Sequence, residues 1–189
     1  MAGNIEVVGE AGPSGLDQAS FRRVLGRFCT GVTVVAGMDG ERPVGFTCQS
    51  FAALSLEPPL VLFCPGRTSR TWPLLAESGR FCVNVLADRQ EAVSTAFGRG
   101  GVDKFAEVGW HPGPSGSPVL DDVLAWADCT VEAVHEAGDH YVVIGRVQAL
   151  GEGGARNPLL FYRGAYAGVR AEAGPLDALL AWPGQDDWL

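Results

Sequence analysis

The segment 31–48 constrains the fold more than any other, because it has the pattern of two strands with a tight turn between them. Residues 31–37 are rich in β-branched side chains, Asp39-Gly40 is a tight-turn signal, and 42–48 is the second strand. Two strands joined by so short a turn must pair antiparallel. This hairpin argues against a doubly wound parallel sheet, in which a crossover helix follows each strand.

Further strand-like runs predict a mostly β domain. They cover residues 60–64, 81–86, 125–135, 141–149 and 159–162. Gly138-Asp139 marks a second tight turn, and only two short helices, 73–79 and 88–97, are expected among the strands. The Gly/Pro-rich segment 98–124 is expected to be a long ordered loop. About seven strands with tight hairpins favour an antiparallel barrel with a few packed helices.

An amphipathic helix is expected before the first hairpin, with Asp17 or Ser20 as its N-cap. The apolar residues of its stripe, at positions i, i+3, i+4 and i+7, are Phe21, Val24, Leu25 and Phe28. Residues 1–15 have no periodic pattern and are expected to form a disordered lead, and 170–189 a C-terminal tail. The folded domain is therefore placed at 16–169.

Charge and cysteine content exclude several classes of protein. The 189-residue chain carries 14 Lys and Arg against 22 Asp and Glu, a net charge of −8, which argues against non-specific nucleic-acid binding. Its five cysteines include no C-x-x-C pair and are expected to be reduced thiols of a cytoplasmic protein. No apolar run is long enough to span a membrane, and the N-terminus lacks the apolar core of a signal peptide.

The familiar cofactor and catalytic signatures are absent from the sequence. It contains no G-x-G-x-x-G dinucleotide motif, no P-loop, no H-E-x-x-H and no G-x-S-x-G. Its three histidines are not spaced as metal ligands, so no metal site is predicted. A nicotinamide cofactor would have to be held in another way.

Four short segments carry polar groups where chemistry could occur. Thr47–Ser50 lies between two apolar runs and suits either a flat polar ligand or a solvated loop. Residues 67–70 place two arginines and two hydroxyls at an expected helix start, which suits a phosphate or merely a capped surface helix. The only lysine, Lys104, lies in the Gly-rich loop, where it could close over a ligand or form a surface ion pair. His140 follows the Gly138-Asp139 turn, where it could contact a substrate or simply belong to the turn.

Taken together and in order, these segments resemble the flavin reductase family, the small reductase components of two-component flavin monooxygenases. The motifs that carry the resemblance are Phe21–Val35, Gly45–Phe51, Ser55–Leu60, Thr68–Arg70, Phe81–Val85, Asp103–Phe105, Gly138–His140 and Leu160–Gly164. Gly-Asp-His before a strand is similar to the nicotinamide-side signature of the family. The likeness is strongest to reductases that serve aromatic hydroxylases in steroid catabolism or antibiotic biosynthesis.

The resemblance implies a dimeric, antiparallel FMN-binding split β-barrel. It implies hydride transfer from NADH to N5 of FAD or FMN, with FAD preferred, and diffusion of the reduced flavin to a separate oxygenase. No acid–base residue is then needed, because the cofactors carry the redox chemistry and the protein holds them at the right distance. The alternatives are a barrel of the same kind that retains its flavin, as an oxidase or direct electron donor, and a non-catalytic flavin carrier.

The resemblance also implies roles for individual residues. His140 would steer the nicotinamide at the catalytic centre, with Arg163 and Tyr166 close by. The implied flavin-binding residues are Thr33, Thr47, Cys48, Gln49, Ser50, Ser55, Cys64, Pro65, Arg67, Ser69, Arg70, Phe97, Lys104 and Phe105. Within this set, the residues at 67, 69 and 70 would hold the phosphate, and those at 97, 104 and 105 would close one side of the site.

Overall fold

The computed structural model describes residues 15–100, 103–154 and 156–169. The predicted lead and tail therefore fall outside the described residues, apart from Gly15. Within the described ranges, no helix is long and apolar enough to cross a membrane. Over the same ranges, no three His, Cys, Asp or Glu side chains come together as a candidate metal site.

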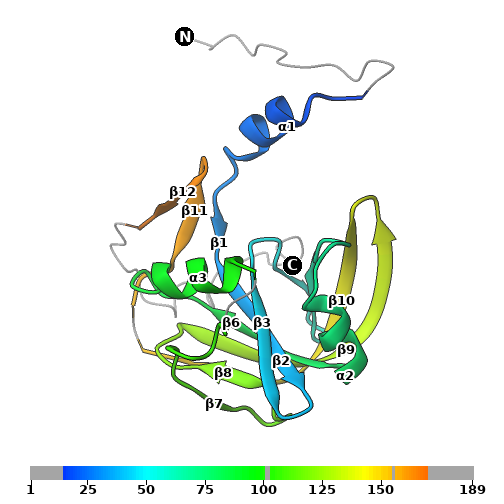
Figure 1. Cartoon of the computed structure of the whole chain (residues 1–189), viewed down its shortest axis with the longest axis vertical. Helices are drawn as coiled ribbons and strands as arrows, with labels where there is room; N and C mark the ends of the chain where they lie inside the picture. Colours follow the sequence, from blue (N-terminus) through cyan, green and yellow to red (C-terminus); the bar gives the residue numbers. More distant parts are fainter. Residues whose placement is uncertain (1–14, 101–102, 155, 170–189) are drawn as a thin grey trace.

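One large antiparallel sheet dominates the fold, with its seven strands in the order β3-β2-β6-β9-β10-β5-β4 (Figure 1). The strand bounds are β2 Thr33–Asp39, β3 Arg42–Cys48, β4 Ala52–Ser55, β5 Leu60–Phe63, β6 Arg80–Val85, β9 Ala125–Ala137 and β10 His140–Glu152. Every neighbouring pair in this sheet is antiparallel. The predicted class, mostly β and antiparallel, is confirmed, and so is the hairpin of β2 and β3, which turns at Gly40 with a φ of +60°.

The sheet must curl, because a very short link joins its two edge strands. β3 ends at Cys48 and β4 begins at Ala52, yet these strands lie at opposite edges of the sheet. The four Cα steps between them span at most about 15 Å, whereas seven strands laid flat would separate the edges by about 29 Å. The edges therefore approach each other at residues 48–52, which we call the seam. Closure into a complete split barrel stays a prediction.

Smaller elements surround the sheet. The helices are α1 Gln18–Leu25, α2 Trp72–Ser78 and α3 Glu91–Gly98. A three-stranded sheet combines β1 Thr30–Gly31, β11 Leu160–Tyr162 and β12 Ala165–Ala167, and a hairpin joins β7 Trp110–Pro112 to β8 Pro118–Leu120. The expectation that 98–124 has no secondary structure of its own is wrong, because this hairpin lies within it. The strands β4 and β12 were not predicted either.

The core has two apolar clusters, one on each face of β2. Val35 packs in the cluster that contains Phe63, Phe81 and Leu75 of α2. Its neighbour Val34 points to the other face, where the cluster includes Phe97 of α3. Both faces of β2 are buried because α2 covers one and α3 the other, which explains why the segment is apolar at successive positions rather than at alternate ones.

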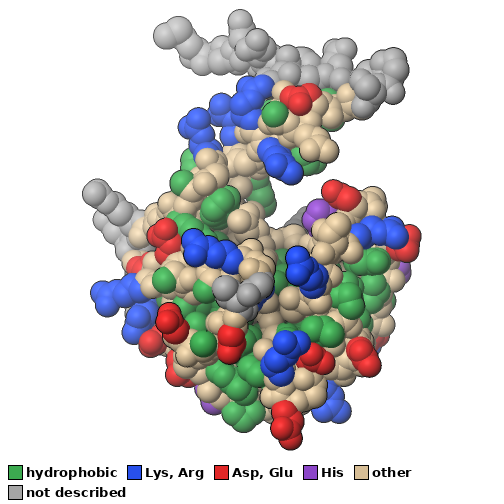
Figure 2. All heavy atoms as spheres, in the orientation of Figure 1, with side chains coloured by type: hydrophobic (Ala, Val, Ile, Leu, Met, Phe, Trp, Pro, Cys, Tyr) green, Lys and Arg blue, Asp and Glu red, His purple; other side chains and the backbone are tan. Residues whose placement is uncertain are grey.

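Helix α1 stands away from the sheet (Figures 1 and 2). It begins as predicted, with the Asp17 carboxylate accepting hydrogen bonds from the amides of Ala19 and Ser20 at 3.2 and 2.9 Å. None of its residues is buried. The expected apolar stripe is instead uncovered within the described residues, with Phe21 53% exposed and the following Phe28 77% exposed.

Candidate functional site

Two adjoining pockets lie beside β3. The smaller, of about 360 Å³, is lined by Phe46, Thr47, Cys48, Gln49, Ser50, Cys64, Pro65, Gly66, Ser69 and His140. The larger, of about 890 Å³, extends over the other half of β3 toward α2 and α3. Phe46, Thr47 and Ser69 line both pockets, so they form a neck between them. A single elongated ligand can therefore occupy both.

The smaller pocket lies at the seam, where side-chain hydroxyls hold the backbone in place. The Ser50 hydroxyl accepts a hydrogen bond from the Cys64 amide at 2.9 Å and lies 3.3 Å from the Cys64 carbonyl, to which it donates. The Thr47 hydroxyl donates to the Ser94 carbonyl on α3 at 2.6 Å, and the Thr33 hydroxyl donates to the Cys48 carbonyl at 2.9 Å. These hydroxyls position the seam and are not free to bind a ligand as donors.

The free donors at the seam belong to Gln49. Among the described residues, its backbone amide donates no hydrogen bond and its side-chain amide has no partner, whereas the backbone amide of Ser50 is a hydrogen-bond partner of the Cys48 thiol. Gln49 and Ser50 are exposed at the smaller pocket. A free main-chain amide and a free side-chain amide at the pocket suit the carbonyl and ring-nitrogen acceptors along the edge of a flat heterocycle.

The opposite wall of the smaller pocket joins the end of β5 to the tip of the β9–β10 hairpin. Gly66 forms an isolated bridge with His140, and the Tyr141 amide donates to the Pro65 carbonyl at 2.9 Å. His140 is half exposed, and its Nδ1 lies 2.8 Å from the Asp139 carboxylate. The hydrogen bond to His140, followed by the charge of the imidazolium, lowers the pKa of Asp139. This contact orients the ring and leaves Nε2 for a ligand.

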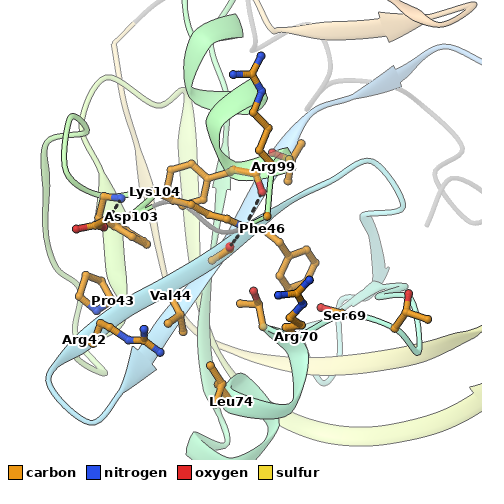
Figure 3. Close-up of a pocket in the computed structure, with 18 residues that line it drawn as sticks. Arg42, Pro43, Val44, Phe46, Ser69, Arg70, Leu74, Arg99, Asp103 and Lys104 are labelled. Atoms are coloured by element: carbon orange, nitrogen blue, oxygen red, sulfur yellow. Dashed lines mark hydrogen bonds between the residues drawn. The ribbon is translucent and has the colours of Figure 1, made fainter.

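The larger pocket is rich in positive charge. Its charged lining residues are Arg42, Arg70, Arg99, Lys104 and the single acid Asp103. Figure 3 shows Arg42 and Arg70 on opposite sides of Val44, which forms part of the floor, whereas Arg99 rises away from that floor. In the described structure, the amides of Thr68, Arg70 and Thr71 also donate no hydrogen bond. The combination of guanidinium groups and free amides suits a phosphate.

Lys104 forms part of the wall between β3 and α3. Its ammonium group donates to the carbonyls of Gly45 at 3.0 Å and Phe97 at 2.9 Å. Burial lowers the pKa of Lys104, because the charged form is partly removed from water. The lysine therefore pins the end of α3 against β3, in addition to placing a charge at the pocket.

The structure brings most of the predicted site residues to the two pockets. Those that line one or both are Thr47, Cys48, Gln49, Ser50, Cys64, Pro65, Ser69, Arg70, Phe97, Lys104, Phe105 and His140. Thr33 lies one layer behind the seam, and Ser55, on β4, lines neither pocket. The sequence reasoning missed Arg42, Arg99 and the apolar floor residue Leu74. No spacing or motif signal marks these positions.

Three predicted residues lie elsewhere. Arg67 pairs with Glu136 at 3.2 Å and stacks over Tyr141 with its guanidinium carbon 5.5 Å from the ring centre, and it lines neither pocket. The Tyr166 hydroxyl donates to the hydroxyl of Ser94, a buried residue of α3, at 2.9 Å. Arg163, at a φ of +52°, donates its amide to the Gly26 carbonyl. None of these three lines a pocket with His140 in the described structure.

Comparison with known proteins places this fold and site in a family. The chain matches the flavin reductase like domain over residues 25–170, and it belongs to this family. This confirms the family predicted from the motifs. The reductase subunit HsaB of a flavin-dependent monooxygenase from Mycobacterium tuberculosis is 52% identical over 183 residues, which cover 92% of this chain and 98% of that protein.

Solved structures agree with this assignment. A homologue of nitrilotriacetate monooxygenase component B from Mycobacterium thermoresistibile superposes with a TM-score of 0.81 at 55% identity, covering 84% of this chain and 89% of that one. The NADH:FAD oxidoreductase SgcE6 of Streptomyces globisporus, solved with NAD and FAD fragments, gives a TM-score of 0.79 at 36% identity, covering 84% and 96%.

Proposed function

We propose that this protein is an NADH-dependent flavin reductase that prefers FAD to FMN. Its family and the names of its relatives support an oxidoreductase of this kind. The observation that carries the proposal is the smaller pocket, in which the free backbone amide of Gln49 on the seam lies across from a wall that ends in His140. When the dihydronicotinamide and the flavin are bound together, the dihydronicotinamide supplies a hydride and the flavin accepts it.

In this proposal the chain's own residues bind and orient. The backbone and side-chain amides of Gln49 hold the polar edge of the ring, while Cys64 and Pro65 lie along its face. Ser69, at the neck, and Arg70, next to it in the larger pocket, bind the ribityl phosphate. His140 contacts the nicotinamide carboxamide through Nε2, and Asp139 fixes its tautomer. No proton has to be moved by the protein, so the contact between His140 and Asp139 serves to orient the ring.

A direct assay tests the activity. Purified protein is mixed anaerobically with NADH and free FAD, and the visible flavin absorbance is followed. We expect bleaching at a rate proportional to protein concentration. A rate that is independent of the protein would refute the proposed activity.

The alternatives to this proposal differ in whether the flavin is released, retained or merely bound. A reductase releases flavin, whereas an oxidase or direct electron donor retains it through gel filtration and turnover. Exposure of Gln49 and Ser50 favours release, because the ring edge stays open to water. A flavin carrier would bind flavin without using NADH. A His140→Ala variant should keep flavin binding and raise the KM for NADH, an effect that a carrier would not show.

We further propose that a separate oxygenase receives the reduced flavin by diffusion in the cytoplasm. Relatives named as reductase subunits of flavin-dependent monooxygenases support a separate oxygenase. An unlinked oxygenase across a dialysis membrane should still be supplied under anaerobic conditions, and loss of that supply would favour direct contact instead.

We also propose a homodimer, as the resemblance implies. The uncovered apolar stripe of α1 supports it, because Phe21 and Leu25 are 53% and 54% exposed, and burial of such side chains contributes about 1.5–3 kcal/mol each. Light scattering with size exclusion should give twice the chain mass. Phe21→Ser combined with Phe28→Ser should lower that mass, and an unchanged monomer in the parent protein would contradict the proposal.

A further inference from the structure

The larger pocket exceeds what a mononucleotide needs. If the flavin ring occupies the smaller pocket and the ribityl phosphate lies in the neck at Ser69, most of the 890 Å³ of the larger pocket has no part of the ligand to bind. The space is continuous with the neck and opens over β3. A ligand that uses it must extend past the first phosphate.

The charge of this pocket is opposite to that of the chain. Four cationic residues and one acid line it, in a protein whose net charge is −8. Arg42 pairs with Asp39 at 2.8 Å and its side chain is 70% exposed, so its guanidinium keeps free donors. Among the described residues, Arg70 makes no ion pair. The pocket is therefore built for an anion with more than one phosphate.

The floor of the same pocket is apolar. Val44 lies between Arg42 and Arg70 in Figure 3, and Phe46 and Leu74 line the same pocket. An aromatic and two aliphatic side chains beside guanidinium groups suit a purine ring joined to a diphosphate.

We propose that the larger pocket binds the adenylate half of FAD and thereby sets the preference for FAD over FMN. Arg70, next to the neck residue Ser69, contacts the phosphate that both flavins share, and Arg42, across Val44, contacts the phosphate that only FAD has. This inference rests on the proposed flavin reductase function and adds to it a residue that determines specificity. NADH carries an adenosine diphosphate of the same chemistry, and the experiment separates the two sources.

The test compares three arginine variants of the full-length protein. Equilibrium binding of FAD, FMN and AMP to flavin-free protein is measured by calorimetry, and KM is measured for FAD, FMN and NADH. Arg42→Gln should weaken FAD about tenfold, the lower end for a lost charge-assisted hydrogen bond, and change FMN less than about twofold. Arg70→Gln should weaken both flavins. Arg89→Gln, an exposed arginine outside both pockets, is the matched control.

The binding of AMP provides a test of the pocket that does not depend on catalysis. It should bind the parent protein, compete with FAD, and bind more weakly to the Arg42→Gln variant. Equal effects of Arg42→Gln on FAD and FMN, or none on either, would overturn the inference. So would a rise in the KM for NADH alone, which would assign the pocket to NADH. In each of these cases NADH-dependent flavin reduction by the parent protein would still stand, so failure here is distinct from failure of the proposed function.

Discussion

The Ser50 hydroxyl joins the seam to the end of β5 through its hydrogen bonds with Cys64, a contact that we call the clasp. Removing this hydroxyl tests how the flavin site is built. Ser50→Ala deletes the acceptor of the Cys64 amide and the donor to the Cys64 carbonyl, at 2.9 and 3.3 Å. Each neutral hydrogen bond contributes about 0.5–1.5 kcal/mol net, and the exposed position favours the low end. We therefore expect the free energy of unfolding to fall by about 1–2 kcal/mol.

The same variant should weaken flavin binding indirectly. Without the clasp, the link that carries the free amide of Gln49 loses its anchor to the end of β5, so this amide is less well placed. Urea unfolding followed by tryptophan fluorescence gives the stability, since Trp72 is buried in the core. Flavin titration gives the affinity. Gln49→Ala is the matched control, because its exposed side chain makes no hydrogen bond among the described residues.

The two readouts separate a clasp from a direct ligand. A clasp predicts that stability and affinity fall together in Ser50→Ala, while Gln49→Ala leaves stability within about 0.5 kcal/mol of the parent. If Ser50→Ala binds flavin more weakly but unfolds at the same urea concentration as the parent, the hydroxyl contacts the ligand directly. The argument that the seam is held by its side chains would then be wrong.

Three further predictions follow from the same structure. Thr47→Val, which keeps side-chain volume but loses the bond to α3, should lower the free energy of unfolding by about 1 kcal/mol, and unchanged urea stability would contradict it. Lys104→Met removes the lysine donor from two carbonyls. It should lower the free energy of unfolding by about 1–3 kcal/mol in the same assay and weaken the affinity for FAD. Burial raises the pKa of Cys82, and raises that of Cys129 to about 12, from an ordinary value of 9.0. The unfolded chain then loses these protons first, so stability should fall as pH rises above 9.0, and Cys129→Ala should flatten that fall in alkaline urea titrations.

Local signals predicted the main sheet well. The β2–β3 hairpin was found because β-branched runs flank Asp39-Gly40, and β3 has the predicted bounds of 42 and 48. The β7–β8 hairpin was missed because each strand has three residues, and because a proline ends β7 and begins β8, so no alternation is visible. The exposure of α1 could not be predicted either, since an amphipathic stripe shows that a helix face needs cover and does not show what covers it.

The site was predicted as a set of segments and less well as a set of contacts. Sequence order identified the segments around residues 47–50 and His140, because their polar groups interrupt apolar runs. It could not show that Arg67 leaves the pocket while Arg70 lines it, since that depends on Tyr141 and Glu136 of a distant hairpin. Arg42 was overlooked because a charged residue after a tight turn is ordinary, and only folding brings it across the floor from residue 70.

The free backbone amide of Gln49 at the seam bears on how sites of this kind can diverge. A donor that belongs to the main chain persists through almost any side-chain replacement, so position 49 is free to drift without loss of the ligand. Proline is the exception, because it removes the N–H itself. Selection then acts on the Ser50 hydrogen bonds and on the residues that hold the seam from behind. A polar residue retained at position 50 would reflect the need to hold the loop in place more than contact with the ligand. Proteins that bind the same heterocycle in this way need not resemble one another at the residues that touch it.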